Sequence, residues 1–329
     1  MALEDAETQV DTALNTGDPR GLSFENVFSG VPSFLRRQLR TDAQDAQLAI
    51  LGLPFDQAVT NRPGARFGPR AIRDASLLMA GDPPFGWDYD VLSSCSIVDC
   101  GDVAYDYGVP EDFANHAQQR VSEILGAGAA PLILGGDHSA SLPVLRACAK
   151  FHGPLAIIQI DAHTDTWPVS EKERMCHGTF LARAVREGLI DTNRSILVGI
   201  RTQCPDNCGI KIITAPECHT ITPNVLAERI RARVGVGPAY LSFDIDGLDP
   251  AFAPGTGTPV MGGLVPQQAL GVLRALAGIP LVGADVMEVC PPYDTSGITA
   301  LAGAQIGLEL LGLLGWSRGG PGTLPQPTT

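Results

Sequence analysis

Residues 238–250, PAYLSFDIDGLDP, change within a few positions from an apolar run to a group of carboxylates. In an extended strand, residues two apart lie on the same face, so Asp244 and Asp246 should point in the same direction. Two ionised carboxylates at the end of a buried strand repel each other and lose hydration. The segment therefore predicts a strand that ends at a site for a positively charged group.

Seven further apolar runs resemble strands, and helical patterns separate many of them. The predicted strands are 46–54, 95–103, 131–136, 154–161, 195–201, 210–215, 238–246 and 280–289, and the predicted helices include 111–128, 141–152, 222–235, 265–278 and 298–316. Near-continuous apolar strands alternating with helices are typical of a parallel sheet covered on both faces. We therefore predict one α/β domain over residues 46–316, with eight parallel strands.

The two ends of the chain lack this pattern. Residues 1–45 show no clear periodicity and are predicted to form an N-terminal arm, in which the basic run FLRRQLR (34–40) is interpreted as a surface or subunit contact. Residues 317–329 are rich in glycine and proline, which predicts a disordered tail.

Composition limits the class of protein. The net charge of −13 argues against electrostatic binding of nucleic acid. The acidic start MALEDAETQVDTALN lacks the pattern of a secretory signal, and the apolar run 298–316 contains Gln305 and Glu309. We interpret that run as a buried helix rather than a membrane span, and we expect a cytoplasmic protein.

The eight cysteines are too few for a disulfide scaffold. Cys204 and Cys208, with Cys218 and His219 downstream, could form a metal knuckle, but their spacing matches no common zinc pattern. We therefore do not expect structural zinc there. In VDCGDV, Asp99 and Asp102 are interpreted as structural carboxylates.

Polar side chains follow three of the predicted strands. His138 follows strand 131–136, Asp161, His163 and Asp165 follow strand 154–161, and Asp244 and Asp246 end strand 238–246. Each motif alone is more often a cap, a turn or a loop histidine. Because ligands of open α/β sheets bind at the carboxyl ends of the strands, the three together predict a metal site. Two divalent ions would balance four carboxylates, and mixed oxygen and nitrogen ligands suit Mn²⁺ or a similar ion.

Five motifs in order resemble the ureohydrolases, the family of arginases and agmatinases. They are RPGARFGPRAIR (62–73), GGDHS, DAHTDT, SFDIDGLDPAFAPGTGTP and EVCPPYD (288–294), within a region of similarity over roughly 45–315. The resemblance implies the three-layer arginase-like fold and two Mn²⁺ ions per chain, with Ni²⁺ as the alternative. It also implies a homo-oligomer, a trimer or a hexamer, although a hetero-oligomer with a related subunit remains possible.

The resemblance also implies roles for individual residues. The first ion would be held by His138, Asp161, Asp165 and Asp244, and the second by His163, Asp161, Asp244 and Asp246. Glu288 would hold the guanidinium of the substrate, and Asp165 or His177 would relay a proton to the leaving amine. Activated water would then convert a guanidine to urea and an amine.

The wording of the motifs resembles family members that act on agmatine, which would yield putrescine and urea. Selectivity should lie in the loops 167–176 and 202–209, whose candidate residues are Trp167, Lys172, Arg174 and Asp206. Asp206 could face an amine, whereas Lys172 or Arg174 could meet a carboxylate. The alternatives are guanidinobutyrate or another guanidino acid, guanidine, and a biguanide such as metformin. Two other classes also stay open: a single-zinc deacetylase and a non-catalytic partner subunit.

Overall fold

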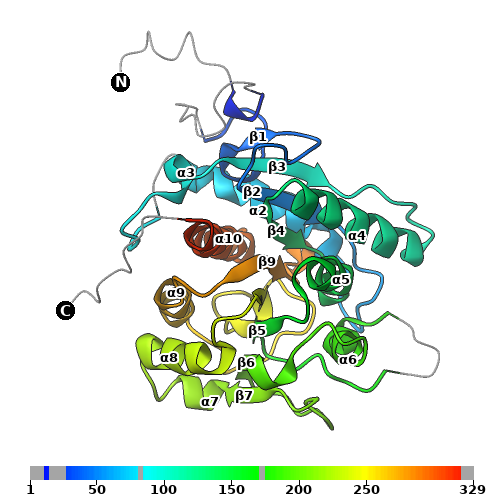
Figure 1. Cartoon of the computed structure of the whole chain (residues 1–329), viewed down its shortest axis with the longest axis vertical. Helices are drawn as coiled ribbons and strands as arrows, with labels where there is room; N and C mark the ends of the chain where they lie inside the picture. The colour runs from blue at the N-terminus through cyan, green and yellow to red at the C-terminus, as the bar shows by residue number, and fades with distance from the viewer. Residues whose placement is uncertain (1–10, 15–26, 81–83, 170–174, 320–329) are drawn as a thin grey trace.

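A parallel sheet runs through the centre of the molecule (Figure 1). The computed structural model describes residues 11–14, 27–80, 84–169 and 175–319. Within these residues the sheet has nine strands in the order β1-β3-β2-β4-β9-β8-β5-β6-β7. The strands are β1 (Gln38–Leu39), β2 (Leu48–Leu53), β3 (Ile97–Asp102), β4 (Ala130–Gly135), β5 (Ala156–Ile160), β6 (Ile196–Ile200), β7 (Lys211–Thr214), β8 (Ala239–Asp244) and β9 (Leu281–Met287).

All eight predicted strands are present, and every pairing is parallel. Six of them are buried along almost their whole length, which explains their continuous apolar runs. The ninth strand, β1, has two residues and pairs with β3 at the edge of the sheet. A two-residue strand is too short to show a periodic pattern in the sequence.

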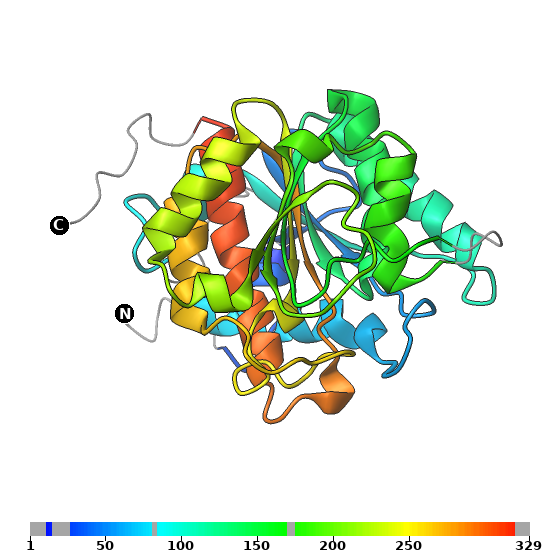
Figure 2. The same cartoon turned by 90° about the horizontal axis from the view of Figure 1, so that it is seen from below.

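Helices cover both faces of the sheet and complete three layers (Figure 2). One face carries α4 (Pro110–Gly126), α5 (Ser141–His152) and α6 (Phe180–Arg186), and the other carries α2 (Gly68–Ser76), α8 (Pro223–Val234), α9 (Pro266–Ala275) and α10 (Ile298–Ser317). The remaining α-helices are the short α3 (Val91–Ser94) and α7 (Ala215–Cys218). Each layer of helices buries its own hydrophobic cluster against the sheet.

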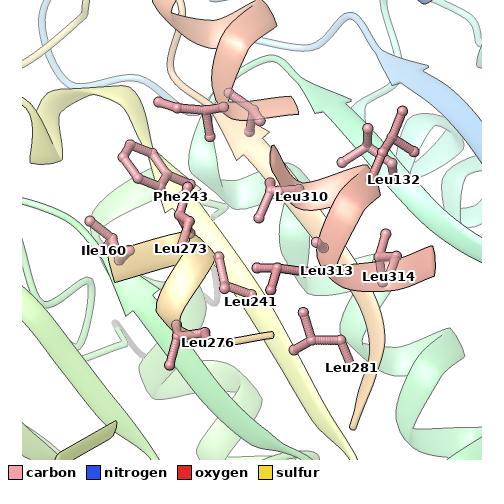
Figure 3. Close-up of a cluster of buried hydrophobic side chains, with 14 of the residues drawn as sticks. Leu132, Ile160, Leu241, Phe243, Leu273, Leu276, Leu281, Leu310, Leu313 and Leu314 are labelled. Atoms are coloured by element: carbon pink, nitrogen blue, oxygen red, sulfur yellow. The ribbon is translucent and has the colours of Figure 1, made fainter. Parts of the chain in front are cut away.

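Helix α10 lies in the middle of one of these layers. Its leucines, among them Leu310 and Leu313, pack against Leu241 of β8 and Leu281 of β9 (Figure 3). Among the described residues α10 is the one helix long and apolar enough to cross a membrane, but 78% of its most apolar window is buried inside the protein. The prediction of a buried helix is therefore confirmed.

Part of the predicted N-terminal arm packs into the fold. Phe34 and Leu35, in the short 3-10 helix η2 (Phe34–Arg36), are fully buried, and β1 follows them. The interpretation of the basic run 34–40 as a surface contact was wrong for its central residues, since Arg36 and Arg37 are 4% and 2% exposed. Arg37 donates hydrogen bonds to the carbonyls of Leu35 and Leu92, so its charged group is used inside the protein.

A buried ion pair joins this segment to the sheet. Arg73 of α2 donates two hydrogen bonds to Asp99 of β3, over 2.8 and 2.9 Å, and a third to Asp102 over 2.5 Å. The Asp99 carboxylate, which has no exposed surface, also accepts the backbone N–H of Phe34 at 2.8 Å. The structural interpretation of Asp99 and Asp102 agrees with these contacts.

We predict that Arg73→Met destabilises the protein strongly, because it leaves Asp99 buried without its counter-charge. Breaking one side of a buried pair typically costs about 3–5 kcal/mol, which urea denaturation would measure as a lower free energy of unfolding.

Arg146→Met provides the matched control, because Arg146 makes the same two-fold contact with Glu187 while both side chains are partly exposed. The expected loss there is about 1 kcal/mol or less. Equal losses in the two variants would contradict a structural role for the buried pair.

Candidate metal centre and active site

Four neighbouring strands carry the candidate site residues at their carboxyl ends. In the sheet these strands stand in the order β4-β9-β8-β5. β4 leads to His138 at the start of η5 (His138–Ala140), β5 to Asp161, β8 ends at Asp244, and β9 is followed by Glu288. Because β4 and β5 are consecutive in the chain but separated by two strands in the sheet, the site lies where the strand order reverses, as expected for open α/β sheets.

The turns after these strands include a position that only glycine can occupy and two non-glycine residues with positive φ. A Cβ atom on Gly136 would lie 1.8 Å from the carbonyl oxygen of Phe55, so only glycine fits directly after β4. Asp165 and Glu288 adopt left-handed backbone conformations with φ of 52° and 64°. Such conformations are costly for side chains other than glycine, and they often occur where a side chain must be aimed at a functional site.

The first cluster consists of His138, Asp161, Asp165 and Asp244. The Nδ1 atom of His138 lies 3.3, 2.9 and 3.0 Å from carboxylate oxygens of Asp161, Asp165 and Asp244, respectively. This nitrogen is buried and has no hydrogen-bond partner. A nitrogen lone pair surrounded by three carboxylate oxygens is an arrangement that fits a divalent cation.

The second cluster consists of Asp161, His163 and Asp246, so the two clusters share Asp161. The Nδ1 atom of His163 lies 3.1 Å from Asp246 and 3.6 Å from Asp161. In each cluster the possible ligand atoms lie within 4.8 Å of one another. The arrangement therefore has room for two cations side by side.

Asp244 belongs to the first cluster alone in this geometry. Its Oδ2 atom faces His138, whereas its Oδ1 atom accepts the backbone N–H of Asp246 at 2.9 Å. The expectation that Asp244 also serves the second ion is therefore not met by the cluster geometry and stays a prediction.

The pKa values show how strongly the clusters need positive charge. Burial raises the pKa of Asp165 to about 6 and, together with the charge of Asp246, raises that of Asp244 well above its usual value. Burial opposes protonation of His163, but its contacts with Asp161 and Asp246 outweigh this effect and raise its pKa to about 12. In the metal-free site, protons on these side chains thus supply positive charge that a metal ion would otherwise provide.

A hydrogen-bonded chain behind His138 orients its ring. Ser242 donates to Asp285 at 2.6 Å, so its oxygen is free to accept the Nε2 proton of His138 at 2.8 Å. Asp285 is fully buried and also accepts hydrogen bonds from Tyr240 and Ser141. The chain aims Nδ1 of His138 at the first cluster, which is how outer partners prepare a metal-binding histidine. Burial opposes protonation of this ring, but Asp161, Asp165 and Asp244 outweigh it and raise the pKa of His138 well above its usual value, so a metal ion would have to displace a proton from Nδ1.

The sequence analysis missed these supporting residues. A carboxylate inside the apolar strand β9 was a usable signal for Asp285, and Ser242 lies two residues before Asp244 on the same face of β8. Gln159 carried both kinds of signal, because it is a polar residue inside the apolar strand β5 and lies two residues before Asp161. It is fully buried in β5, and its amide donates to Oδ2 of Asp161 at 2.7 Å.

Glu288 and His177 lie together beside the first cluster. Oε1 of Glu288 accepts the backbone N–H of His138 at 2.8 Å and contacts Nδ1 of His177 at 2.9 Å. Its other oxygen, Oε2, is buried without a partner. Burial lowers the pKa of His177, but the hydrogen bond with Glu288 outweighs it and raises this pKa to about 9. Nε2 of His177 faces the hydroxyl of Thr60 at 2.9 Å.

A cavity of about 280 Å³ opens onto the two clusters. It is lined by Thr60, His163, Asp165, Trp167, Cys176, His177, Gly178, Asp244 and Thr258. Of the four selectivity candidates, Trp167 lines this cavity, whereas Lys172 and Arg174 lie outside the described residues. The carboxylate of Asp206 accepts the backbone N–H of Cys208 at 2.8 Å, and Asp206 is not among the residues that line the cavity. The expectation that it faces a substrate amine stays a prediction.

The cysteine motif does not form a metal cluster in the described part of the chain. Neither of the two possible ligand groups found there contains a cysteine. Cys218 is buried, and Cys204 contacts the hydroxyl of Thr166 and the carbonyl of Asp206.

We predict that metal binding releases protons and strengthens as the pH rises from 6 to 9. Ligation requires neutral imidazoles and ionised carboxylates. The pKa of His163, raised to about 12, keeps a proton on the metal-free site over this whole range, and the pKa of Asp165, raised to about 6, adds a proton only at the acid end. Calorimetric titration with Mn²⁺ in two buffers of different ionisation enthalpy would count the released protons. Binding without proton release at pH 7 would contradict the prediction.

Comparison with known proteins gives a consistent result. The model of the arginase family matches residues 46–312. An agmatinase of Chromobacterium violaceum is 43% identical over 305 residues, which cover 92% of this chain and 95% of that protein.

Two solved structures are also similar. One is a hypothetical agmatinase from Burkholderia thailandensis, with a TM-score of 0.92, 43% identity and coverage of 94% and 99% of the two chains. The other is proclavaminate amidino hydrolase from Streptomyces clavuligerus, with a TM-score of 0.84, 39% identity and coverage of 89% and 100%. The three-layer fold, the paired His/Asp clusters and these matches agree, and the chain belongs to the arginase family.

Proposed function

We propose that this protein hydrolyses agmatine to putrescine and urea at a pair of divalent metal ions. The proposal rests on three features that lie together at one end of the sheet: the two clusters and the unpartnered oxygen of Glu288. Two potential ligand clusters share Asp161, and the unpartnered oxygen of Glu288 lies beside them. A planar guanidinium and two cations are together what these unsatisfied groups require.

The proposed ligands are the six residues of the clusters. His138, Asp161, Asp165 and Asp244 would hold one ion, and Asp161, His163 and Asp246, with Asp244 as a possible further ligand, would hold the other. Carboxylate and imidazole ligands suit Mn²⁺, and Ni²⁺ is the alternative. The ions would supply Lewis acidity and lower the pKa of a water molecule in the site.

Glu288 is proposed to bind the guanidinium. Its Oε1 atom is held by His138 and His177, so the side chain cannot rotate freely. Its Oε2 atom is left as an acceptor, close to Gly257 in the loop that also carries the cavity residue Thr258. An acceptor fixed in this way would orient the substrate carbon for attack.

His177 and Asp165 are proposed to handle the proton that the leaving amine needs. Both side chains line the cavity. Asp165 has a pKa raised to about 6 by burial, which is suited to accepting and returning a proton near neutral pH. His177 is anchored at Nδ1 by Glu288, so Nε2, which faces Thr60, is the atom available for exchange.

The lining of the cavity supports a cationic substrate. Among the described residues that line it, none is lysine or arginine, so a substrate carboxylate would have no counter-charge there. The agmatinase relatives point to the same substrate. The amidino hydrolase relative is named for another substrate at 39% identity, so the tail of the substrate must be tested directly. A cytoplasmic location and a homo-oligomeric state complete the proposal.

We predict that Glu288→Gln lowers kcat/KM by on the order of 10²-fold or more, as expected for the loss of one transition-state contact. The glutamine carbonyl could still accept the bonds from His138 and His177, and its NH₂ group would then face the guanidinium, a donor against a donor. Steady-state kinetics of urea release would measure the loss.

Glu309→Gln is the matched control, since Glu309 is an equally buried carboxylate that pairs with Arg274, belongs to neither cluster and does not line the cavity. It should lower stability while leaving kcat/KM near that of the wild type. An unchanged kcat/KM in Glu288→Gln would show that Glu288 only supports the structure.

We further predict that agmatine is a better substrate than 4-guanidinobutyrate by about 10²-fold in kcat/KM, because the carboxylate of the latter would be desolvated without a partner. The two compounds have similar lengths, so the comparison isolates the charge of the tail. Urea release should be measured from both, and from guanidine and metformin, with Mn²⁺ and with Ni²⁺.

Faster turnover of 4-guanidinobutyrate would overturn the assignment of agmatine and leave the reaction type standing. A preference for guanidine or metformin would show that the shape of the cavity decides. Binding of a single zinc ion without release of urea from any of these compounds would contradict the whole proposal.

A further inference from the structure

Arg201 follows β6 directly and lies beside the second cluster without belonging to it. Within the described part of the chain, its guanidinium donates hydrogen bonds only to backbone carbonyls. They are those of Asp246 (2.5 Å), Leu248 (3.2 Å), Val260 (2.8 and 3.0 Å), Gly199 (3.2 Å) and Gly247 (3.4 Å). Three of these residues are consecutive and include the proposed ligand Asp246.

The backbone of the same residue is tied to the other half of the cluster. The N–H of Arg201 donates to the carbonyl of Ala162 at 3.1 Å, and Ala162 lies between Asp161 and His163. The N–H of Ala162 in turn donates to Oδ1 of Asp246 at 3.1 Å. Arg201 therefore connects the loop after β5 with the loop after β8, and these two loops supply every member of the second cluster.

The loop after β8 depends on these donors. The backbone carbonyls of residues 246–248 and 260 all accept hydrogen bonds from one guanidinium. Without it, these carbonyl oxygens would lose that donor in a partly buried loop. The same loop carries Thr258, whose hydroxyl donates to Oδ2 of Asp246 at 3.3 Å. No carboxylate forms an ion pair with Arg201 among the described residues. Its hydrogen bonds instead fix the conformation of the backbone around it.

The first cluster has a different support. His138 is oriented by Ser242, and Asp161 receives the amide of Gln159. Among the described residues, the Arg201 guanidinium forms no hydrogen bond with His138, Asp165 or Asp244. Loss of the guanidinium should therefore affect the two clusters unequally.

A positive charge near a cation site also has an opposite effect. By Coulomb repulsion, Arg201 would weaken the binding of a second cation, and its removal would then strengthen that binding. The geometric and the electrostatic effects predict opposite signs, so one measurement separates them. We expect the geometric effect to dominate, because a misplaced Asp246 loses a direct ligand contact.

We propose that Arg201 is a positioning residue that assembles the second metal-binding cluster, Asp161, His163 and Asp246, by holding two loops in register. The inference rests on the proposed binuclear site. It assigns to Arg201 a role in the binding of one ion of the two rather than in contact with the substrate.

The experiment compares the wild type with Arg201→Met and Arg201→Lys. Arg231→Met is the matched control, because Arg231 is also half-buried and also donates only to backbone carbonyls, those of Ala275 and Ala277, between α8 and the end of α9. Mn²⁺ binding is measured by equilibrium dialysis with elemental analysis, and folding by circular dichroism.

The wild type and Arg231→Met should bind two ions per chain. In Arg201→Met the second ion should bind about 10–100-fold more weakly, the usual cost of losing an outer partner, while the first keeps its affinity. Arg201→Lys keeps the charge but lacks the planar fork, so it should also weaken the second ion.

Wild-type or tighter binding of both ions by folded Arg201→Met would overturn the inference. If Arg201→Met does not fold, Arg201→Lys decides, and two ions bound with wild-type affinity in that variant would overturn it. Equal weakening of both ions would also count against it. If the wild type binds only one ion, the proposed binuclear function is itself wrong. If the wild type binds two ions, the binuclear site stands, and the variants then test the role of Arg201 alone.

Discussion

The mutual repulsion of buried carboxylates is the constraint on which the rest of the structure depends. Asp161, Asp165, Asp244 and Asp246 are each 6% exposed or less, and they stand at the ends of adjacent strands. Four carboxylates this close together cannot all be ionised in a medium of low polarity unless cations lie among them. The backbone must therefore hold these residues together against their repulsion, and the rigid parallel sheet, packed on both faces, supplies that resistance.

Hydrogen-bonding partners around the carboxylates turn this repulsion into a defined geometry. Ser242 and Asp285 orient His138, Gln159 holds Asp161, and Arg201 arranges the backbone around Asp246. Each partner satisfies acceptors without occupying the space between the ligands. These partners thus fix the orientation of the cluster side chains, while a cation bound between the side chains would balance their negative charge.

Much of this could be predicted from the sequence, and the failures have physical causes. The eight strands were visible because strands buried on both faces are continuously apolar, and the ligands because residues two apart share a face. The edge strand β1 was too short to show a period. The burial of Arg36 and Arg37 depends on distant partners such as the carbonyl of Leu92. The sequence alone could not place Asp206, because a carboxylate that caps a turn has the same local sequence as one that faces a ligand.

The proposed chemistry and the proposed selectivity of the site rest on different parts of the fold. Glu288 and the cluster residues come from the ends of central strands, and all of them except the partly buried His163 are almost completely buried. A change in their geometry would therefore disturb the core. The rim of the cavity comes from loops, and Trp167 there is 48% exposed. Substitutions at the rim can alter which substrate tail is accepted without moving the ligands. This division explains how relatives with about 40% identity to this chain share its fold and yet are named for different substrates.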